Sequence, residues 1–195
     1  AIGMICNSPS LVSVHPSVPV YGIKDLLALA KTKPGQIHYA SAGIGTNPHI
    51  AGELFNHMGK ARLVAVHFKG GGPGLIAAMS GEVSATFTNI AETSTFVRAK
   101  KLRALAVTSP KRSPAFTELP TVAESGLPGY AFTSWYGLFT TGGTDPAIVE
   151  RLAQEVRKIM ERPEVQAQFE AQGLDPETSD PKSFKQQIDR ELTRW

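Results

Sequence analysis

A glycine-rich segment, YASAGIGTNPHIAGELF at residues 39–55, carries the residue types and spacing that best suit binding chemistry. The apolar run before it predicts a strand, and the spacing of apolar residues after it predicts a helix. A helix that starts directly after a glycine turn presents unpaired backbone N–H groups and the positive end of its dipole, which together favour an anion. The segment therefore predicts an anion site, to which we expect six residues to contribute: Ser41, Gly43, Gly45, Thr46, Asn47 and His49.

The same turn suits a small carboxylate or phosphate group better than a dinucleotide. The dinucleotide fingerprint GxGxxG fails, because Pro48 stands where the third glycine belongs. Gly43 and Gly45 allow the backbone to approach a ligand closely. We expect Thr46 or Asn47 to cap the helix, with Pro48 at its first position. A glycine-rich turn that binds nothing is the open alternative.

Two further predicted strands end beside residues that suit the same site. The segment HFKGGGPG at residues 67–74 also lies between a strand and a helix, and it lacks the Gly-Lys-Ser/Thr ending of a Walker loop. Ligands of open α/β sheets bind outside the carboxyl ends of the strands. We therefore expect Phe68, Gly70 and Asn89 to face the same ligand. Lys69 is better explained as a solvated side chain than as an anion contact.

Catalytic and metal-binding patterns are absent. The five histidines show no metal-ligand spacing, and no nucleophile stands beside an orienting base. The only cysteine, Cys6, excludes an intrachain disulfide and a four-cysteine zinc site. A net charge of +3 is too weak to indicate a nucleic-acid partner, and no apolar stretch is long enough to insert into a membrane. We expect binding without a catalytic residue, metal or cofactor; a hydrolase with an oxyanion site at the turn is the less favoured alternative.

Strand and helix patterns alternate along the first part of the chain, which predicts an α/β fold with a mainly parallel sheet. Prolines then break residues 109–129 into loop and turns, and Asp-Pro pairs start two amphipathic helices at Asp145 and Asp180. We expect a complete ligand-binding domain at residues 10–120. Residues 1–9 and 121–195 are expected to form a crossing strand and the C-terminal part of another domain. The reason is that the two amphipathic helices after Asp145 and Asp180 need a partner surface to cover their apolar sides.

Several long segments together resemble the Bug (TctC-like) family, the solute receptors of tripartite tricarboxylate transporters. They are PSVPVYGIKDLLALAKTKPGQIHYASAGIGTNPHIAGELF, FKGGGPGLIAAMSGEV, KLRALAVTSPKRSPAFTELPTVAESGLPGY and TSWYGLFTTGGTDPAIVERLAQEV. The resemblance implies a periplasmic binding protein with two α/β domains, mainly parallel sheets and a cleft between them, one domain being incomplete here. It also implies a small carboxylate or amino-acid ligand, whose carboxylate meets residues 41–49, and delivery to the membrane subunits of a transporter.

The sequence departs from the family pattern in a few places. Family members have an N-terminal stretch whose glycine-rich loop forms the other cleft wall, and we expect this chain to bind weakly without it. Ser84 stands where the family usually has Asp, and Lys100 where it usually has Gly. A metabolite sensor and an interaction module of the same fold are the alternatives to a transport receptor.

Overall fold

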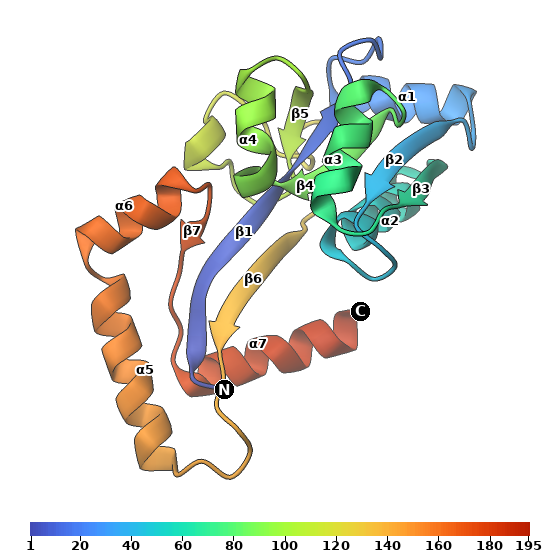
Figure 1. Ribbon diagram of the computed structural model, residues 1–195. Coiled ribbons are helices and arrows are strands. Elements are labelled where there is room, and N and C mark those ends of the chain that lie inside the picture. Colours follow the sequence, from blue (N-terminus) through green and yellow to red (C-terminus); the bar gives the residue numbers. More distant parts are fainter. The chain divides into compact units, whose positions relative to one another are not determined.

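The computed structural model describes residues 1–195 and divides into two compact units. The larger unit is Pro9–Ser134, and the smaller unit combines Ala1–Ser8 with Trp135–Trp195 (Figure 1). The chain passes from one unit to the other twice, within strand β1 (Gly3–Val14) and within strand β6 (Thr133–Leu138). The strand expected within residues 1–9 is thus part of β1, which continues to Val14. No helix has the length and apolar character that a membrane crossing would require.

The larger unit alternates strands and helices as the sequence predicts. After β1, its elements are α1 (Ile23–Thr32), β2 (Ile37–Ser41), α2 (Asn47–Gly59), β3 (Leu63–His67), α3 (Gly71–Ser80), β4 (Ala85–Asn89), α4 (Ile90–Arg98), β5 (Arg103–Val107) and a short 3-10 helix, η1 (Pro114–Phe116). Helix α2 includes Gly59, and the residue that ends it is Lys60, which is left-handed with φ 47°.

The sheet of the larger unit is mixed rather than mainly parallel. Its strand order is β3-β2-β4-β1-β5. Strand β2 runs parallel to β3 and β4, whereas β1 runs antiparallel to both β4 and β5. Four strands therefore point one way, and β1 lies among them in the opposite direction. A run of hydrophobic residues predicts a strand buried on both faces, but it does not predict whether that strand runs parallel or antiparallel to its neighbours.

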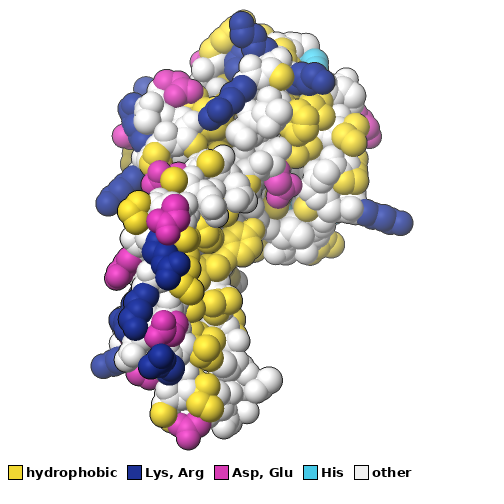
Figure 2. Space-filling model, turned by 60° about the vertical axis from the view of Figure 1, so that its left-hand side comes forward, with side chains coloured by type: hydrophobic (Ala, Val, Ile, Leu, Met, Phe, Trp, Pro, Cys, Tyr) yellow, Lys and Arg dark blue, Asp and Glu magenta, His cyan; other side chains and the backbone are white.

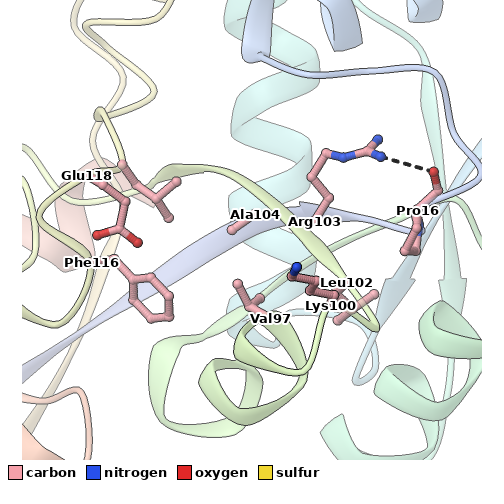
Figure 3. Close-up of a pocket in the computed structure, with 9 residues that line it drawn as sticks. Pro16, Val97, Lys100, Leu102, Arg103, Ala104, Phe116 and Glu118 are labelled. Carbon is pink, nitrogen blue, oxygen red and sulfur yellow. Dashed lines mark hydrogen bonds between the residues drawn. The ribbon is translucent and has the colours of Figure 1, made fainter.

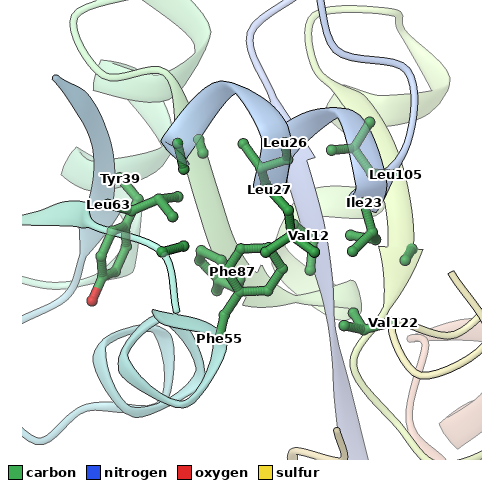
Figure 4. Close-up of a cluster of buried hydrophobic side chains, with 14 of the residues drawn as sticks. Val12, Ile23, Leu26, Leu27, Tyr39, Phe55, Leu63, Phe87, Leu105 and Val122 are labelled. Carbon is green, nitrogen blue, oxygen red and sulfur yellow. The ribbon is translucent and has the colours of Figure 1, made fainter. Parts of the chain in front are cut away.

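Helices cover both faces of this sheet. Helices α1 and α2 pack on one face in the main core, and α3 and α4 pack on the other in two smaller clusters (Figures 1 and 4). The rings of Tyr39 and Phe55 both lie against Phe87, with centroids 5.4 and 5.5 Å away. A Cβ at Gly52 would overlap the Tyr39 ring, so glycine is required for α2 to lie this close to β2.

The core of the larger unit extends beyond the expected boundary at residue 120. Val122, Leu127, Tyr130 and Phe132 are buried in the main core. The hydroxyl of Tyr130 also donates a hydrogen bond of 3.0 Å to the carbonyl of Ala51 in α2. The proline-rich stretch thus covers the larger unit rather than linking two domains. Prolines predict the loop conformation but not which surface the loop packs on.

The smaller unit is built from helices around two strand pairings. It contains α5 (Pro146–Met160), α6 (Pro163–Ala171), β7 (Asp175–Pro176) and α7 (Pro181–Arg194), with β7 and β6 paired to β1. Asp145 and Asp180 cap α5 and α7 through their side chains, as the sequence predicts. Helix α6 was not predicted, because it buries no residue and so lacks a clear apolar stripe. Phe184 is fully buried between Trp135 and Phe139.

One side of α5 is apolar and uncovered. Ile148, Leu152 and Ile159 lie one or two turns apart and are 54%, 39% and 45% exposed. The same helix also carries exposed charged side chains that form ion pairs, such as Arg151 with Glu155 at 3.3 Å. Figure 2 shows hydrophobic side chains gathered in a column beside charged ones in this part of the chain. This matches the expectation that the C-terminal helices need a partner surface.

Candidate anion-binding site

The ends of β2, β3 and β4 lie at one edge of the sheet of the larger unit. Because β2 and β3 are parallel, their last residues Ser41 and His67 are direct partners in the register. The backbone N–H of Phe68 donates to the carbonyl of Ser41 at 2.8 Å. Strand β4 pairs with β2 in the same direction and continues to Asn89. The structure therefore places all three predicted strand ends on the same edge.

The glycine turn between β2 and α2 is held by side-chain hydroxyls. Ser41 Oγ donates to the Gly43 carbonyl at 3.0 Å and accepts from the Gly43 N–H at 3.2 Å. Thr46 Oγ1 donates to the same carbonyl at 2.7 Å. Gly45 adopts φ 75°, a left-handed conformation, and a Cβ there would meet no atom within 4 Å. The turn thus has a fixed backbone with open space beside Gly45.

Helix α2 begins without a side-chain cap. Thr46 occupies the N-cap position, but its hydroxyl is turned back to Gly43 and does not cap the helix. Thr46 is thus the N-cap residue, as expected, but its side chain makes no capping hydrogen bond, because the rotamer that donates to Gly43 turns the hydroxyl away from the helix N–H groups. Asn47 is the first helical residue, Pro48 is the second, and no acidic residue lies in the first turn. Backbone N–H groups at this helix start remain available to an anion.

His49 faces back into the turn as a hydrogen-bond acceptor. The N–H of Gly45 donates to His49 Nδ1 at 3.2 Å. A backbone N–H can only donate, so Nδ1 carries no proton and the neutral ring keeps its proton on Nε2. The hydroxyl of Tyr39 donates to Glu53 Oε1 at 2.9 Å and also lies 3.3 Å from the His49 carbonyl. His49 therefore presents one defined N–H donor.

The side chain of Asn89 is oriented by a hydrogen bond from the adjacent strand β1. Its side chain is buried, and Oδ1 accepts a hydrogen bond of 2.9 Å from Ser10 Oγ on β1. Ser10 is fixed in turn, because its N–H donates to Thr108 Oγ1 at 2.9 Å. The amide N–H groups of Asn89 are left as donors at the strand end. Ser10 and Thr108 could not be recognised from the sequence, since one lies on β1 and the other directly follows β5, in segments separate from β4.

The second glycine-rich segment differs from the first at its helix start. Gly70 is the N-cap of α3, with φ 105°. A Cβ at the next residue, Gly71, would overlap the carboxylate of Glu92, so this carboxylate already lies against the start of α3. Phe68 is half-buried and packs on the cluster beneath α3. No hydrogen bond joins Gly70 to the turn at residues 41–49. Of the two helix starts, only that of α2 is free of a protein carboxylate.

His67 is the site residue that the sequence did not single out. Its Nδ1 lies 3.1 Å from Ser41 Oγ, and its ring centroid lies 5.0 Å from that of His49, edge to face. The serine–histidine contact is not a hydrolase arrangement, because Ser41 is buried and no carboxylate orients the imidazole. No group of three or more potential metal ligands is present anywhere.

A separate cavity of about 360 Å³ lies at the start of β5, at the other end of the strands (Figure 3). Its Arg103 guanidinium is held by the carbonyls of Val18 and Pro16, 3.0 and 3.2 Å away, and lies over the Tyr21 ring. None of the predicted site residues lines this cavity. Ser84, the departure from the family pattern, also precedes β4 at this opposite edge.

The comparisons with known proteins agree with this fold. All of residues 1–195 match the TctC family, described as the tripartite tricarboxylate transporter family receptor. The chain therefore belongs to this family of solute receptors. The family inferred from the quoted sequence segments is confirmed, and so is the α/β fold of periplasmic binding proteins.

Individual relatives match over the whole of this chain. Protein BugT of Bordetella pertussis is 29% identical over 194 residues, which are 100% of this chain and 60% of BugT. The structure of R. palustris Rpa4515 with adipate has a TM-score of 0.92 at 31% identity, covering 100% of this chain and 65% of that one. MatC from Rhodopseudomonas palustris with bound malate has a TM-score of 0.84 at 25% identity, covering 100% and 67%. The chain thus spans about 60% of the length of BugT.

Proposed function

We propose that this protein is an extracytoplasmic receptor that captures a small carboxylate-bearing metabolite for a tripartite tricarboxylate-type transporter. The observation that carries the proposal is the uncapped start of α2, which faces an open glycine turn in a receptor-family chain. An anion at this position meets free N–H groups and the positive end of the helix dipole.

The chemistry of the turn selects an acceptor-only ligand group. Acceptors near the turn are already paired within the protein: His49 Nδ1 with Gly45, and Asn89 Oδ1 with Ser10. The N–H groups of Gly43, Gly45 and Thr46 are bonded within the turn. What remains for a ligand is the unpaired N–H groups at the start of α2, the imidazole N–H of His49 and the amide N–H groups of Asn89. An ionised carboxylate offers only acceptors and so fits this set, whereas an ammonium group would face donors alone.

The binding free energy that a micromolar receptor needs is easier to reach when the ligand is held from two sides. Charge-assisted hydrogen bonds contribute roughly 1.5–3 kcal/mol each, and the helix dipole about 0.3–1 kcal/mol. A micromolar receptor needs about 8 kcal/mol after desolvation and ordering costs. We therefore propose that the larger unit, Pro9–Ser134, which contains the expected domain of residues 10–120, is one ligand-binding wall. The smaller unit would belong to a second domain that supplies the other wall.

The relatives support the ligand class. Rpa4515 was solved with adipate and MatC with malate, both of which are small dicarboxylates. We extend this class to the present protein, together with the periplasmic location and the transporter membrane subunits as partners. Which carboxylate is bound depends on the second wall.

The test is a thermal-shift screen of mono-, di- and tricarboxylates and amino acids with the protein as its gene encodes it. We expect a ligand-specific rise in melting temperature that His49→Ala reduces. His57→Ala is the matched control, because His57 is exposed in the last turn of the same helix. If no carboxylate raises the melting temperature, the receptor function is wrong and an interaction module takes its place.

A further inference from the structure

His67 occupies a position that the proposed function does not yet use. It is the exposed last residue of β3, directly beside Ser41 in the parallel register. Its Nδ1 is engaged by Ser41 Oγ at 3.1 Å, and its ring lies against the ring of His49. No protein group pairs with its Nε2. The imidazole thus borders the glycine turn and has one nitrogen free.

The hydroxyl of Ser41 decides which nitrogen of His67 carries the proton. That hydroxyl has one hydrogen, which can go to the Gly43 carbonyl or to His67 Nδ1. The Gly43 carbonyl keeps a donor in either case, because Thr46 Oγ1 lies only 2.7 Å from it. Ser41 can therefore turn its hydrogen to His67 without leaving an unpaired carbonyl. His67 then holds its proton on Nε2.

We propose that His67 is a specificity-determining residue of the anion site. When the ligand binds, Ser41 turns its hydrogen from the Gly43 carbonyl to His67 Nδ1, which fixes the neutral imidazole as an Nε2–H donor. This donor binds an oxygen of the ligand carboxylate beside the Nε2–H of His49. The inference rests on the proposed receptor function and adds a residue to it. With two imidazole donors and the start of α2, the site favours a ligand group that presents two acceptor oxygens, as a carboxylate does.

Two substitutions separate the roles of the two ring nitrogens. Glutamine at residue 67 places its amide near the position of Nε2 and keeps a donor for the ligand. Asparagine reaches only the position of Nδ1, so it retains the contact with Ser41 but not the contact with the ligand. His38→Asn is the matched control, because His38 is an exposed histidine near the start of the neighbouring strand β2, away from the carboxyl ends of the strands.

The experiment is calorimetric titration of the protein, as its gene encodes it, with adipate as the probe. We expect His67→Gln and His38→Asn to bind adipate nearly as tightly as the unaltered protein. His67→Asn should bind about tenfold or more weakly, the loss expected for one charge-assisted hydrogen bond. Nitrogen-15 NMR of the imidazoles should show His67 converting to the Nε2–H tautomer as adipate is added.

The outcomes distinguish failure of the proposed role of His67 from failure of the proposed receptor function. Binding by the unaltered protein with equal affinity in His67→Asn, or with no change in the His67 resonances, overturns the role of His67 and leaves the receptor function standing. Failure of the unaltered protein to bind any carboxylate in the thermal-shift screen overturns both. A weaker His67→Asn together with a weaker His38→Asn also counts against the proposal, since it indicates a general loss of structure.

Discussion

Ser41 and His67 end two parallel neighbouring strands, and the hydroxyl of one lies 3.1 Å from the imidazole of the other. This contact ties the glycine turn after β2 to the end of β3. It also places two residues 26 positions apart in the chain at the start of α2. The candidate site is thus a property of the sheet edge, held by the parallel register.

A negative charge placed at the start of α2 should compete with the ligand. Asn47→Asp keeps the shape of the side chain and puts a carboxylate on the first helical residue. We expect a gain in stability of about 0.3–1 kcal/mol from the helix dipole, together with a loss of carboxylate affinity. Denaturant unfolding and calorimetric titration measure the two quantities. Lower stability, or unchanged affinity, would contradict the placement of the anion at this helix start.

The orientation of Asn89 should depend on Ser10. Ser10→Ala removes the hydroxyl that donates to Asn89 Oδ1, and we expect a loss of about 1 kcal/mol in stability and weaker ligand binding. Ser13→Ala is the control on the same buried strand, because Ser13 Oγ has no hydrogen-bond partner. That change should leave stability unchanged or raised. Equal effects of the two substitutions on binding would show that Asn89 is not positioned by Ser10.

The Cys6 thiol should be unreactive in the folded protein. Burial, with a smaller effect of the Asp175 carboxylate, raises its pKa to about 11. The folded protein therefore keeps the thiol protonated where the unfolded chain ionises, so this group lowers stability as the pH rises above about 9. Labelling with a thiol reagent at pH 8 should be slow in native protein and fast in urea, because only the thiolate reacts. Rapid labelling of native protein would contradict this burial.

Local signals in the sequence were sufficient for much of this structure. The Asp-Pro pairs at Asp145 and Asp180 start helices where expected, and the apolar spacing after the glycine turn located α2. The direction of β1 could not be read, because its residues are buried on both faces whichever way it runs.

The details of the site depended on contacts between distant residues. The hydroxyl of Thr46 had a competing acceptor at Gly43 that only the folded turn brings near. The approach of Glu92 to Gly71 and of His67 to Ser41 also joins segments on different elements. Residue types identified the glycine turn correctly as a strand-to-helix turn. They could not show which of the two helix starts is free of a protein carboxylate.

The most direct test of the anion site compares two glycines that have nearly the same positive φ. Gly45 at the turn and Gly35 before β2 have φ values of 75° and 76°, and a Cβ at either would meet no atom within 4 Å. Alanine at either position should therefore cost a similar amount of stability, about 1 kcal/mol, because both must adopt a left-handed conformation. Calorimetric titration with adipate should show binding lost in Gly45→Ala, whose methyl group fills the space beside the turn, and retained in Gly35→Ala. Equal adipate affinity in the two variants would contradict a carboxylate site at the start of α2.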